Sequence, residues 1–285
     1  MSRLSVRKTY KLFIGGAFPR SESGRSYKVM DKSGNFIANP AMASRKDARD
    51  AVVAARSALS GWSGTTAYNR GQILYRVAEL MESRRDEFIE EVSLCEGIGK
   101  GKSAKVLDAA IDRWVWYAGW SDKLGSILGA TNPVAGPFYN FSIPEPVGVV
   151  ALIAPQDSSL LGLIDLLGAA LTSGNTVVAL ASEKAPLPAI TLSEVLATSD
   201  VPAGVVNILT GNTKEVAPWL ASHMDVDAIN LAGVEMDDVR QLASEATDNL
   251  KRVIPPKSQD WSRTPTLTAM TSTLEVKTVW HPIGV

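Results

Sequence analysis

Cysteine and histidine are the scarcest chemistry-bearing residues in this chain of 285 residues. It contains one cysteine, Cys95, and two histidines, His223 and His281, which lie far apart. A single cysteine excludes an internal disulfide, and no Cys/His cluster has the spacing of a zinc site. We therefore expect no metal site.

An excess of charge of either sign is also missing. Lys and Arg number 29 and Asp and Glu number 30, which gives a net charge of −1. A protein that binds nucleic acid through phosphate contacts needs a basic excess, and so does a polybasic protein of the membrane surface. We therefore expect neither nucleic acid nor a membrane among the partners.

Long apolar runs are absent as well. No stretch approaches the roughly 18 residues of a membrane span, and the charged start of the chain has no apolar stretch behind it that would make a signal peptide. Together with the single cysteine, these absences favour a reducing, cytoplasmic location. The remaining composition, 45% hydrophobic and 21% charged, is typical of a globular protein.

Residues 146–256 have the most regular pattern. Apolar runs of strand length alternate with segments of helical periodicity, beginning with the run Val147–Ala154. This alternation predicts an α/β fold, a Rossmann-like parallel sheet with flanking helices. Ligands of such sheets bind where the strands end, here near residues 155–159, 180–184, 211–217 and 232–236.

Helical periodicity dominates residues 1–128. Ser44, followed three residues later by Asp47, is close to a capping box and predicts a helix start. A longer helical pattern runs from Ile73 to Val92, and a third helix is predicted from Ala104 to Leu124. This part of the chain is therefore an N-terminal helical region.

The end of the chain has a different pattern. Residues 257–268 are polar, contain a proline and predict a linker. Residues 269–285 include an alternating run, Thr273–Trp280, which predicts a strand that seeks a partner edge. A second alternating run, Phe138–Ile143, lies in the segment 129–145, and we expect the two runs to pair.

Several of these segments resemble, in order, the superfamily of NAD(P)-dependent aldehyde dehydrogenases. The matching motifs are Leu12–Gly16, Tyr117–Lys123, Glu145–Val150, Gly174–Val178, Pro202–Gly211, Ala221–Asp227, Leu250–Val253 and Leu274–Val279. The resemblance covers nearly the whole chain. It implies that residues 146–256 are a cofactor-binding domain with 1–128 as its helical part, and that 129–145 and 269–285 form an oligomerisation hairpin and strand.

The resemblance ends where the catalytic residues of that family would begin. After Val253 the family continues with a glutamate general base and a catalytic domain that carries the nucleophilic cysteine. Here the linker 257–268 stands in place of that domain, so the chain resembles a pseudoenzyme. Cys95 lies near the end of an N-terminal helix, and we interpret it as a packing residue. We expect no catalytic residue.

The strand-end motifs that the resemblance assigns to catalysis and to the cofactor are altered. After Pro155, Asp157 occupies the position of the family's oxyanion-binding asparagine, where an ionised carboxylate has no proton to donate. Glu183 retains one acceptor for the adenosine ribose, whereas Leu180 replaces the lysine that would assist it.

The two glycine turns that would meet the pyrophosphate are degraded too. Thr213 and Ala217 replace close-approach glycines, and the serine of the second turn is either replaced by Val234 or absent. Such turns make a poor pyrophosphate site. The remaining candidate cofactor-binding residues are Pro155, Glu183, Gly211 and Gly233. We expect no cofactor, although the resemblance keeps NAD(P) open.

Two hypotheses of different class follow. In the first, the chain is non-catalytic on its own and is a structural or regulatory subunit of an aldehyde dehydrogenase assembly. In the second, it is an NAD(P)-dependent oxidoreductase acting on aldehydes, with the catalytic cysteine supplied by a partner subunit. The retained oligomerisation segments favour the first. Because the family's terminal strand pairs with a neighbour's catalytic domain, we expect a hetero-oligomer with a full-length aldehyde dehydrogenase to be more stable than a homo-oligomer.

A third possibility, a gene remnant without a role, stays open. The caps, turns and core pattern agree with one another, and this consistency indicates a chain that folds.

Overall fold

Five parallel strands form the central sheet, in the order β7-β6-β5-β8-β9. The computed structural model describes residues 7–284. The strands are β5 (Val149–Ile153), β6 (Thr176–Leu180), β7 (Val206–Leu209), β8 (Ala228–Asn230) and β9 (Arg252–Ile254). The chain moves outward in one direction from β5 to β7 and then returns to add β8 and β9 on the other side. The strand order therefore reverses between β5 and β8, the place where sheets of this kind take their ligands.

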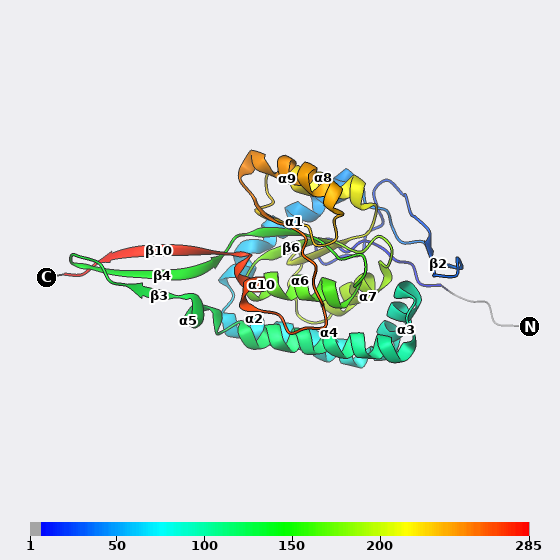
Figure 1. Cartoon of the computed structure of the whole chain (residues 1–285), viewed down its shortest axis with the longest axis horizontal. Coiled ribbons are helices and arrows are strands. Elements are labelled where there is room, and N and C mark those ends of the chain that lie inside the picture. Colours follow the sequence, from blue (N-terminus) through cyan, green and yellow to red (C-terminus); the bar gives the residue numbers. More distant parts are fainter. Residues whose placement is uncertain (1–6, 285) are drawn as a thin grey trace, which may run out of the picture.

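Helices cover both faces of this sheet (Figure 1). On one face lie α2 (Ala67–Ser83), α3 (Arg85–Glu96), α4 (Lys100–Trp120), α6 (Leu161–Thr172) and α7 (Leu187–Leu196). On the other lie α1 (Arg45–Gly64), α8 (Thr213–Ser222) and α9 (Met236–Glu245), with the 3₁₀ turn η1 (Ala246–Asn249) after α9. Alternate side chains of β5 enter the two cores, Val150 and Leu152 one of them and Val149, Ala151 and Ile153 the other. The predicted α/β fold is confirmed.

The capping box predicted at Ser44 is present. The Ser44 hydroxyl accepts a hydrogen bond from the backbone amide of Asp47, whose carboxylate accepts one from the amide of Ser44. Both orphan donors at the start of α1 are thereby satisfied, and the helix begins at the predicted residue.

The single long helix predicted from Ile73 to Val92 is wrong. The chain leaves the helical conformation at Arg84, whose φ is −115°, and α2 and α3 are separate helices. The guanidinium of Arg84 binds the carboxylates of Glu87 and Glu194, and Glu194 belongs to α7. Both helices pack mainly on α4, and the break also brings α3 against α7. An apolar period continuous through both helices conceals such a turn.

The segment before β1 forms isolated bridges rather than a strand. Phe13 pairs with Ile208 of β7, and Ile14 with Ala17. Two further short strands, β1 (Val29–Met30) and β2 (Phe36–Ala38), pair with each other.

A second sheet projects from one end of the body (Figure 1). After α5 (Leu124–Leu128), it is built from β3 (Ala130–Asn132), β4 (Phe138–Pro146) and β10 (Leu274–Pro282), in the antiparallel order β10-β4-β3. We call this three-stranded sheet the blade. All nine residues of β10 pair with β4, which confirms the predicted pairing of the two alternating runs.

Residues 255–266 connect β9 to the short helix α10 (Leu267–Thr271). In Figure 1 this segment runs from the sheet across α6 to α4 and returns to α10. We call it the strap. The strap corresponds to the linker predicted at 257–268. The last two residues of that predicted linker, 267 and 268, belong to α10. In the described part of the chain, none of the helices combines the length and the apolarity that crossing a membrane requires.

Candidate functional site

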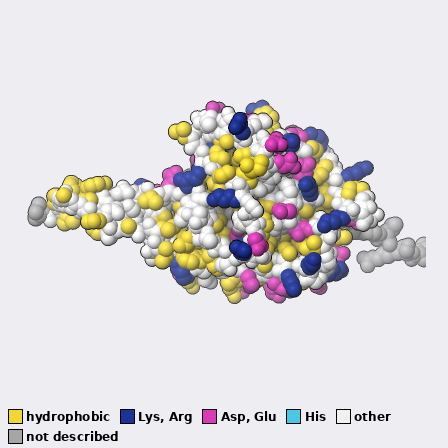
Figure 2. Space-filling view, in the orientation of Figure 1, with side chains coloured by type: hydrophobic (Ala, Val, Ile, Leu, Met, Phe, Trp, Pro, Cys, Tyr) yellow, Lys and Arg dark blue, Asp and Glu magenta, His cyan; other side chains and the backbone are white. Residues whose placement is uncertain are grey.

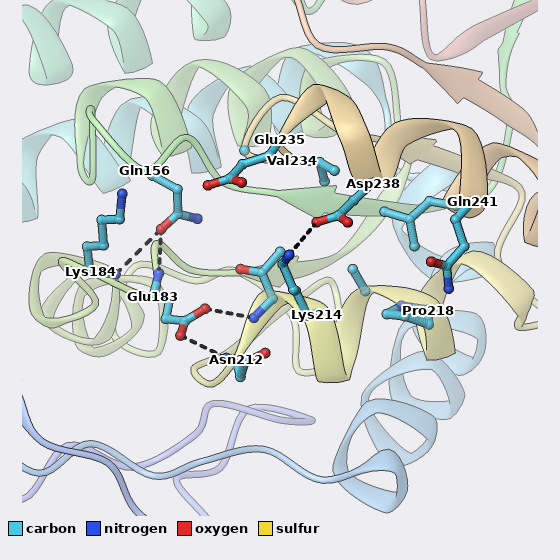
Figure 3. Close-up of a pocket in the computed structure, with 14 residues that line it drawn as sticks. Gln156, Glu183, Lys184, Asn212, Lys214, Pro218, Val234, Glu235, Asp238 and Gln241 are labelled. Atoms are coloured by element: carbon cyan, nitrogen blue, oxygen red, sulfur yellow. Dashed lines mark hydrogen bonds and ion pairs between the residues drawn. The ribbon is translucent and has the colours of Figure 1, made fainter.

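A cavity of about 340 Å³ lies between α8 and α9, at the carboxyl ends of the central strands (Figure 3). Its walls come from the loops that follow β5, β6, β7 and β8, and from both helices. Its polar lining includes Gln156, Glu183, Asn212, Lys214, Glu235 and Asp238, and its apolar lining Ala217, Pro218, Val234 and Leu242. The cavity lies at the strand ends where the sequence predicted a ligand site.

Gln156 joins two of the loops that form the cavity. Its side-chain oxygen accepts hydrogen bonds from the backbone amide of Glu183 at 3.0 Å and from the hydroxyl of Ser182 at 3.3 Å. The loop after β5 is thereby fixed to the loop after β6, and the Glu183 side chain is held facing α8 (Figure 3).

Glu183 occupies the start of α8. Its two carboxylate oxygens accept 2.9 Å hydrogen bonds from the side-chain amide of Asn212 and from the backbone amide of Thr213, the first residue of the helix. Asn212 is the N-cap and accepts a further bond from the backbone amide of Glu215. A helix start attracts anions through its free amides and dipole, and here a side chain of the same chain already serves as the anion.

The start of α9 carries three acidic residues. Its N-cap, Glu235, makes no side-chain capping bond, and Asp237 and Asp238 lie in the first turn. Asp238 reaches across the cavity to the ammonium of Lys214 on α8, 3.3 Å away. Carboxylates at a helix start stabilise the helix, but they repel an incoming phosphate.

These residues give an incoming dinucleotide pyrophosphate an acidic setting. Such a group needs unpaired backbone amides, glycines or hydroxyls at a helix start. The start of α8 is bound by Glu183, and the start of α9 is acidic. Val234 adds an apolar side chain to the lining, and the buried hydroxyl of Thr213 has no hydrogen-bond partner. We derive no chemical step through such a cofactor.

The structure brings two of the four candidate cofactor-binding residues to the cavity. Glu183 and Gly233 line it, whereas Pro155 and Gly211 are buried next to it. Their role in cofactor binding stays a prediction, and so does the role assigned to Asp157, which is exposed on the loop after β5.

Packing accounts for both glycines. A Cβ on Gly233 would overlap the carbonyl oxygen of Ala154, and the Gly233 amide donates a 2.9 Å hydrogen bond to Ile153 at the end of β5. Gly211 has a φ of +154°, and a Cβ there would approach the backbone nitrogen of Ala43 to 3.2 Å. Their presence therefore does not require a ligand.

Cys95 has the environment of an unreactive thiol. Burial near the end of α3, with Glu91 and Glu96 close by, raises the pKa of the thiol to about 12. A nucleophilic cysteine needs the opposite shift, because the thiolate is the reactive form. No group of three or more His, Cys, Asp or Glu side chains within residues 7–284 is arranged to hold a metal ion.

Sequence patterns missed one residue that lines the cavity and one ion pair that lies outside it. Asn212 stands directly before a helical run, a capping signal that could have been recognised. The buried ion pair between Arg113 of α4 and Asp165 of α6 had no such signal, since 52 positions separate the two residues.

Comparisons with known proteins agree with this architecture. The aldehyde dehydrogenase family profile matches residues 18–255. The chain is 35% identical over 263 residues to cytosolic aldehyde dehydrogenase 1 of Elephantulus edwardii, covering 89% of this chain and 51% of that protein. It is 33% identical over 261 residues to cytosolic 10-formyltetrahydrofolate dehydrogenase of Mus musculus, covering 89% of this chain and 29% of that one.

Solved structures give the same result. The NAD⁺ complex of aldehyde dehydrogenase from Bacillus cereus has a TM-score of 0.82 at 28% identity, covering 87% of this chain and 50% of the other. An NAD-dependent aldehyde dehydrogenase from Sinorhizobium meliloti has a TM-score of 0.82 at 27% identity, covering 86% and 49%. The chain thus spans about half the length of most of these relatives, and less of the longest. It belongs to the aldehyde dehydrogenase family.

Proposed function

We propose that this chain is a non-catalytic subunit of an aldehyde dehydrogenase assembly and that it joins its partner through the blade. The observation that carries the proposal is the outer edge of β10, which has no strand beside it anywhere in residues 7–284. An unpaired edge nine residues long is a template for a strand from another chain.

Apolar side chains on both faces of the blade support this proposal. The register places Val276 and Trp280 on one face and Ile143 and Tyr139 on the other. Val276 is 68% exposed and Trp280 57%. Figure 2 shows hydrophobic side chains gathered toward the free end of the blade. Exposed apolar groups in such a narrow projection are typical of a protein interface.

The family relationship supports a heteromeric partner. In the family that the sequence resembles, the terminal strand pairs with the catalytic domain of a neighbouring subunit, and this chain matches only about half of its relatives. A full-length aldehyde dehydrogenase would supply the missing edge. We therefore propose a hetero-oligomer that is more stable than the homo-oligomer. A cytoplasmic location is part of the proposal, and it is supported by the cytosolic relatives.

The first test of this proposal is assembly. The mass of the complete chain is measured by light scattering, alone and with the full-length aldehyde dehydrogenase that co-purifies from the native source, and compared with a chain truncated after Thr268. A sharper variant is Val276→Asp, which puts a charge on the blade, with Val53→Asp on the exposed face of α1 as the matched control. We expect Val276→Asp and the truncation to lose the partner and Val53→Asp to keep it. An unchanged assembly in all variants would refute the proposal.

The competing hypothesis, an oxidoreductase that borrows a catalytic cysteine, is tested by cofactor binding and turnover. We propose that the chain binds NAD(P) weakly or not at all, because Glu183 and the acids of α9 occupy the helix starts. Calorimetric titration should give no micromolar dissociation constant. We also expect no aldehyde-dependent NADH formation by the purified chain and no effect of Cys95→Ala. A turnover signal abolished by that substitution would favour the competitor.

A further inference from the structure

The strap begins where the family profile match ends. The family match stops at residue 255, and residues 255–266 form the strap before α10 begins. A polar linker of this length needs no fixed path, yet this one makes its firmest contacts with buried groups of α4 and α6. These contacts are specific enough to give the strap a function.

The first of these contacts is a buried ion pair. The guanidinium of Arg113 lies 2.5 Å from the carboxylate of Asp165, and their side chains are 5% and 3% exposed. The second guanidinium nitrogen of Arg113 donates hydrogen bonds to the backbone carbonyls of Trp261 at 3.0 Å and Arg263 at 2.7 Å. A buried charge is tolerated only when its hydrogen bonds are satisfied, and the strap satisfies those of Arg113.

Asp165 provides the second contact. One of its carboxylate oxygens binds Arg113 and the hydroxyl of Tyr117. The other accepts a 3.0 Å hydrogen bond from the side-chain amide of Gln259 in the strap. The two members of the ion pair therefore hold the strap at positions 259, 261 and 263, and together they form a latch.

Trp261 lies against the first turns of α6. A Cβ added to Gly162 would stand 3.2 Å from the Trp261 ring, 2.9 Å from Pro155 and 3.1 Å from Ser158. The missing side chain at Gly162 thus leaves the space that the indole uses. The ring contacts α6 beside the loop after β5, at the carboxyl edge of the sheet.

Between its contacts the strap stands away from the body. A cavity of about 400 Å³ lies beneath it, bounded by the strap, by Leu152 of β5 and by Asn230 at the end of β8. A segment that is fixed at a few points over an open space has the construction of a lid rather than of a core element.

We propose that the strap is a lid, latched by Arg113 and Asp165, that closes the carboxyl edge of the sheet beside β8. A second domain could dock on this face of α6 only after displacing the strap. The lid therefore opposes the use of this face by a catalytic domain from a partner. This inference goes beyond the proposed subunit role, and the test uses the chain alone, so its outcome is independent of partner binding.

The test is limited proteolysis with trypsin, followed by mass spectrometry of the fragments. The strap contains two cleavage sites, Lys257 and Arg263, and the side chain of Arg263 is 84% exposed. The carbonyl that trypsin must attack after Arg263 is the one that Arg113 binds. We expect the wild-type strap to be cut slowly despite its exposed side chains.

Gln259→Glu places a carboxylate against Asp165 and should release the strap, with cleavage at Lys257 and Arg263 at least tenfold faster and ahead of cleavage in the body. Ser258→Glu adds the same charge at the neighbouring exposed position and is the matched control, expected to behave as wild type. Trp261→Ala is a second opening variant, which leaves the ion pair intact.

Equal cleavage rates in the wild type, Gln259→Glu and Ser258→Glu would overturn the proposal. So would simultaneous cleavage of strap and body in both opening variants, because the strap would then be part of the core.

Discussion

The backbone amide of Thr213 donates a 2.9 Å hydrogen bond to the carboxylate of Glu183, so a side chain from the end of β6 closes the start of α8. The same carboxylate binds the N-cap residue, Asn212. The chain thus supplies its own anion at a position where related folds present free amides to a ligand.

This relationship predicts a stabilising role for Glu183. Glu183→Ala removes two hydrogen bonds and a favourable interaction with the helix dipole, and should lower the free energy of unfolding by about 1–2 kcal/mol. Glu235→Ala is the control, because Glu235 makes no capping bond at α9, and it should change stability by about 0.5 kcal/mol or less. Urea denaturation measures both, and equal losses would contradict this account.

Gly233 is predicted to tolerate no side chain. Gly233→Ala would drive a methyl group into the carbonyl of Ala154 and should cost about 3 kcal/mol, because the backbone must shift. Gly61→Ala in α1 meets nothing within 4 Å and should stabilise the protein by roughly 0.5–1 kcal/mol. Thermal unfolding of the two variants should therefore shift in opposite directions. A neutral Gly233→Ala would leave a ligand as the better reason for that glycine.

We expect the losses of unfolding free energy to be non-additive when both members of the buried pair under the strap are replaced. Arg113→Met leaves the Asp165 carboxylate without its cation and should cost about 3–5 kcal/mol. Replacing both members, Arg113→Met with Asp165→Leu, should cost less than Arg113→Met alone. Arg85→Met, which breaks only surface pairs with Glu82 and Asp108, should cost about 1 kcal/mol or less. Additive losses in the double-mutant cycle would show that the pair is not coupled.

We expect the free energy of unfolding to fall at alkaline pH because of the raised pKa of Cys95. The folded pKa of about 12 lies above the ordinary value of 9.0, so folding disfavours the thiolate. The contribution of this thiol to stability is full below pH 9 and is lost as the pH rises from 9 toward 12. Cys95→Ala should make the unfolding free energy less dependent on pH over that window.

The same shift predicts slow modification of the thiol. Iodoacetamide should alkylate native Cys95 much more slowly at pH 8 than the urea-unfolded chain, because the raised pKa lowers the fraction of reactive thiolate in the folded state. Comparable rates in both states would show that the thiol is not buried in solution.

The fold was predictable because its signals are local. The apolar runs of β5 and β6 and the capping box at Ser44 each lie within a few residues, and each element formed where it was expected. The break at Arg84 was not predictable, because Arg84 binds Glu194, a residue of a different helix. Local periodicity cannot register a partner 110 positions away.

The candidate site was only partly predictable for a related reason. The position of Glu183 at a strand end followed from the alternating pattern, but its hydrogen bonds to the start of α8 depend on the three-dimensional approach of two loops. The latch is a more extreme case, because Arg113 and Asp165 read as ordinary charged positions on two helices until the strap covers them.

The pairing of β4 with β10 also determines when the blade can form. Ser142 and Thr278 share a hydrogen bond across 136 positions of sequence. Closing so long a loop is entropically costly and slow until the intervening chain has folded. During synthesis the body can therefore fold first, while β4 stays unpaired until the much later β10 has been made. The outer edge of the blade would then change during folding, because β4 forms that edge until β10 covers it and β10 forms it afterwards.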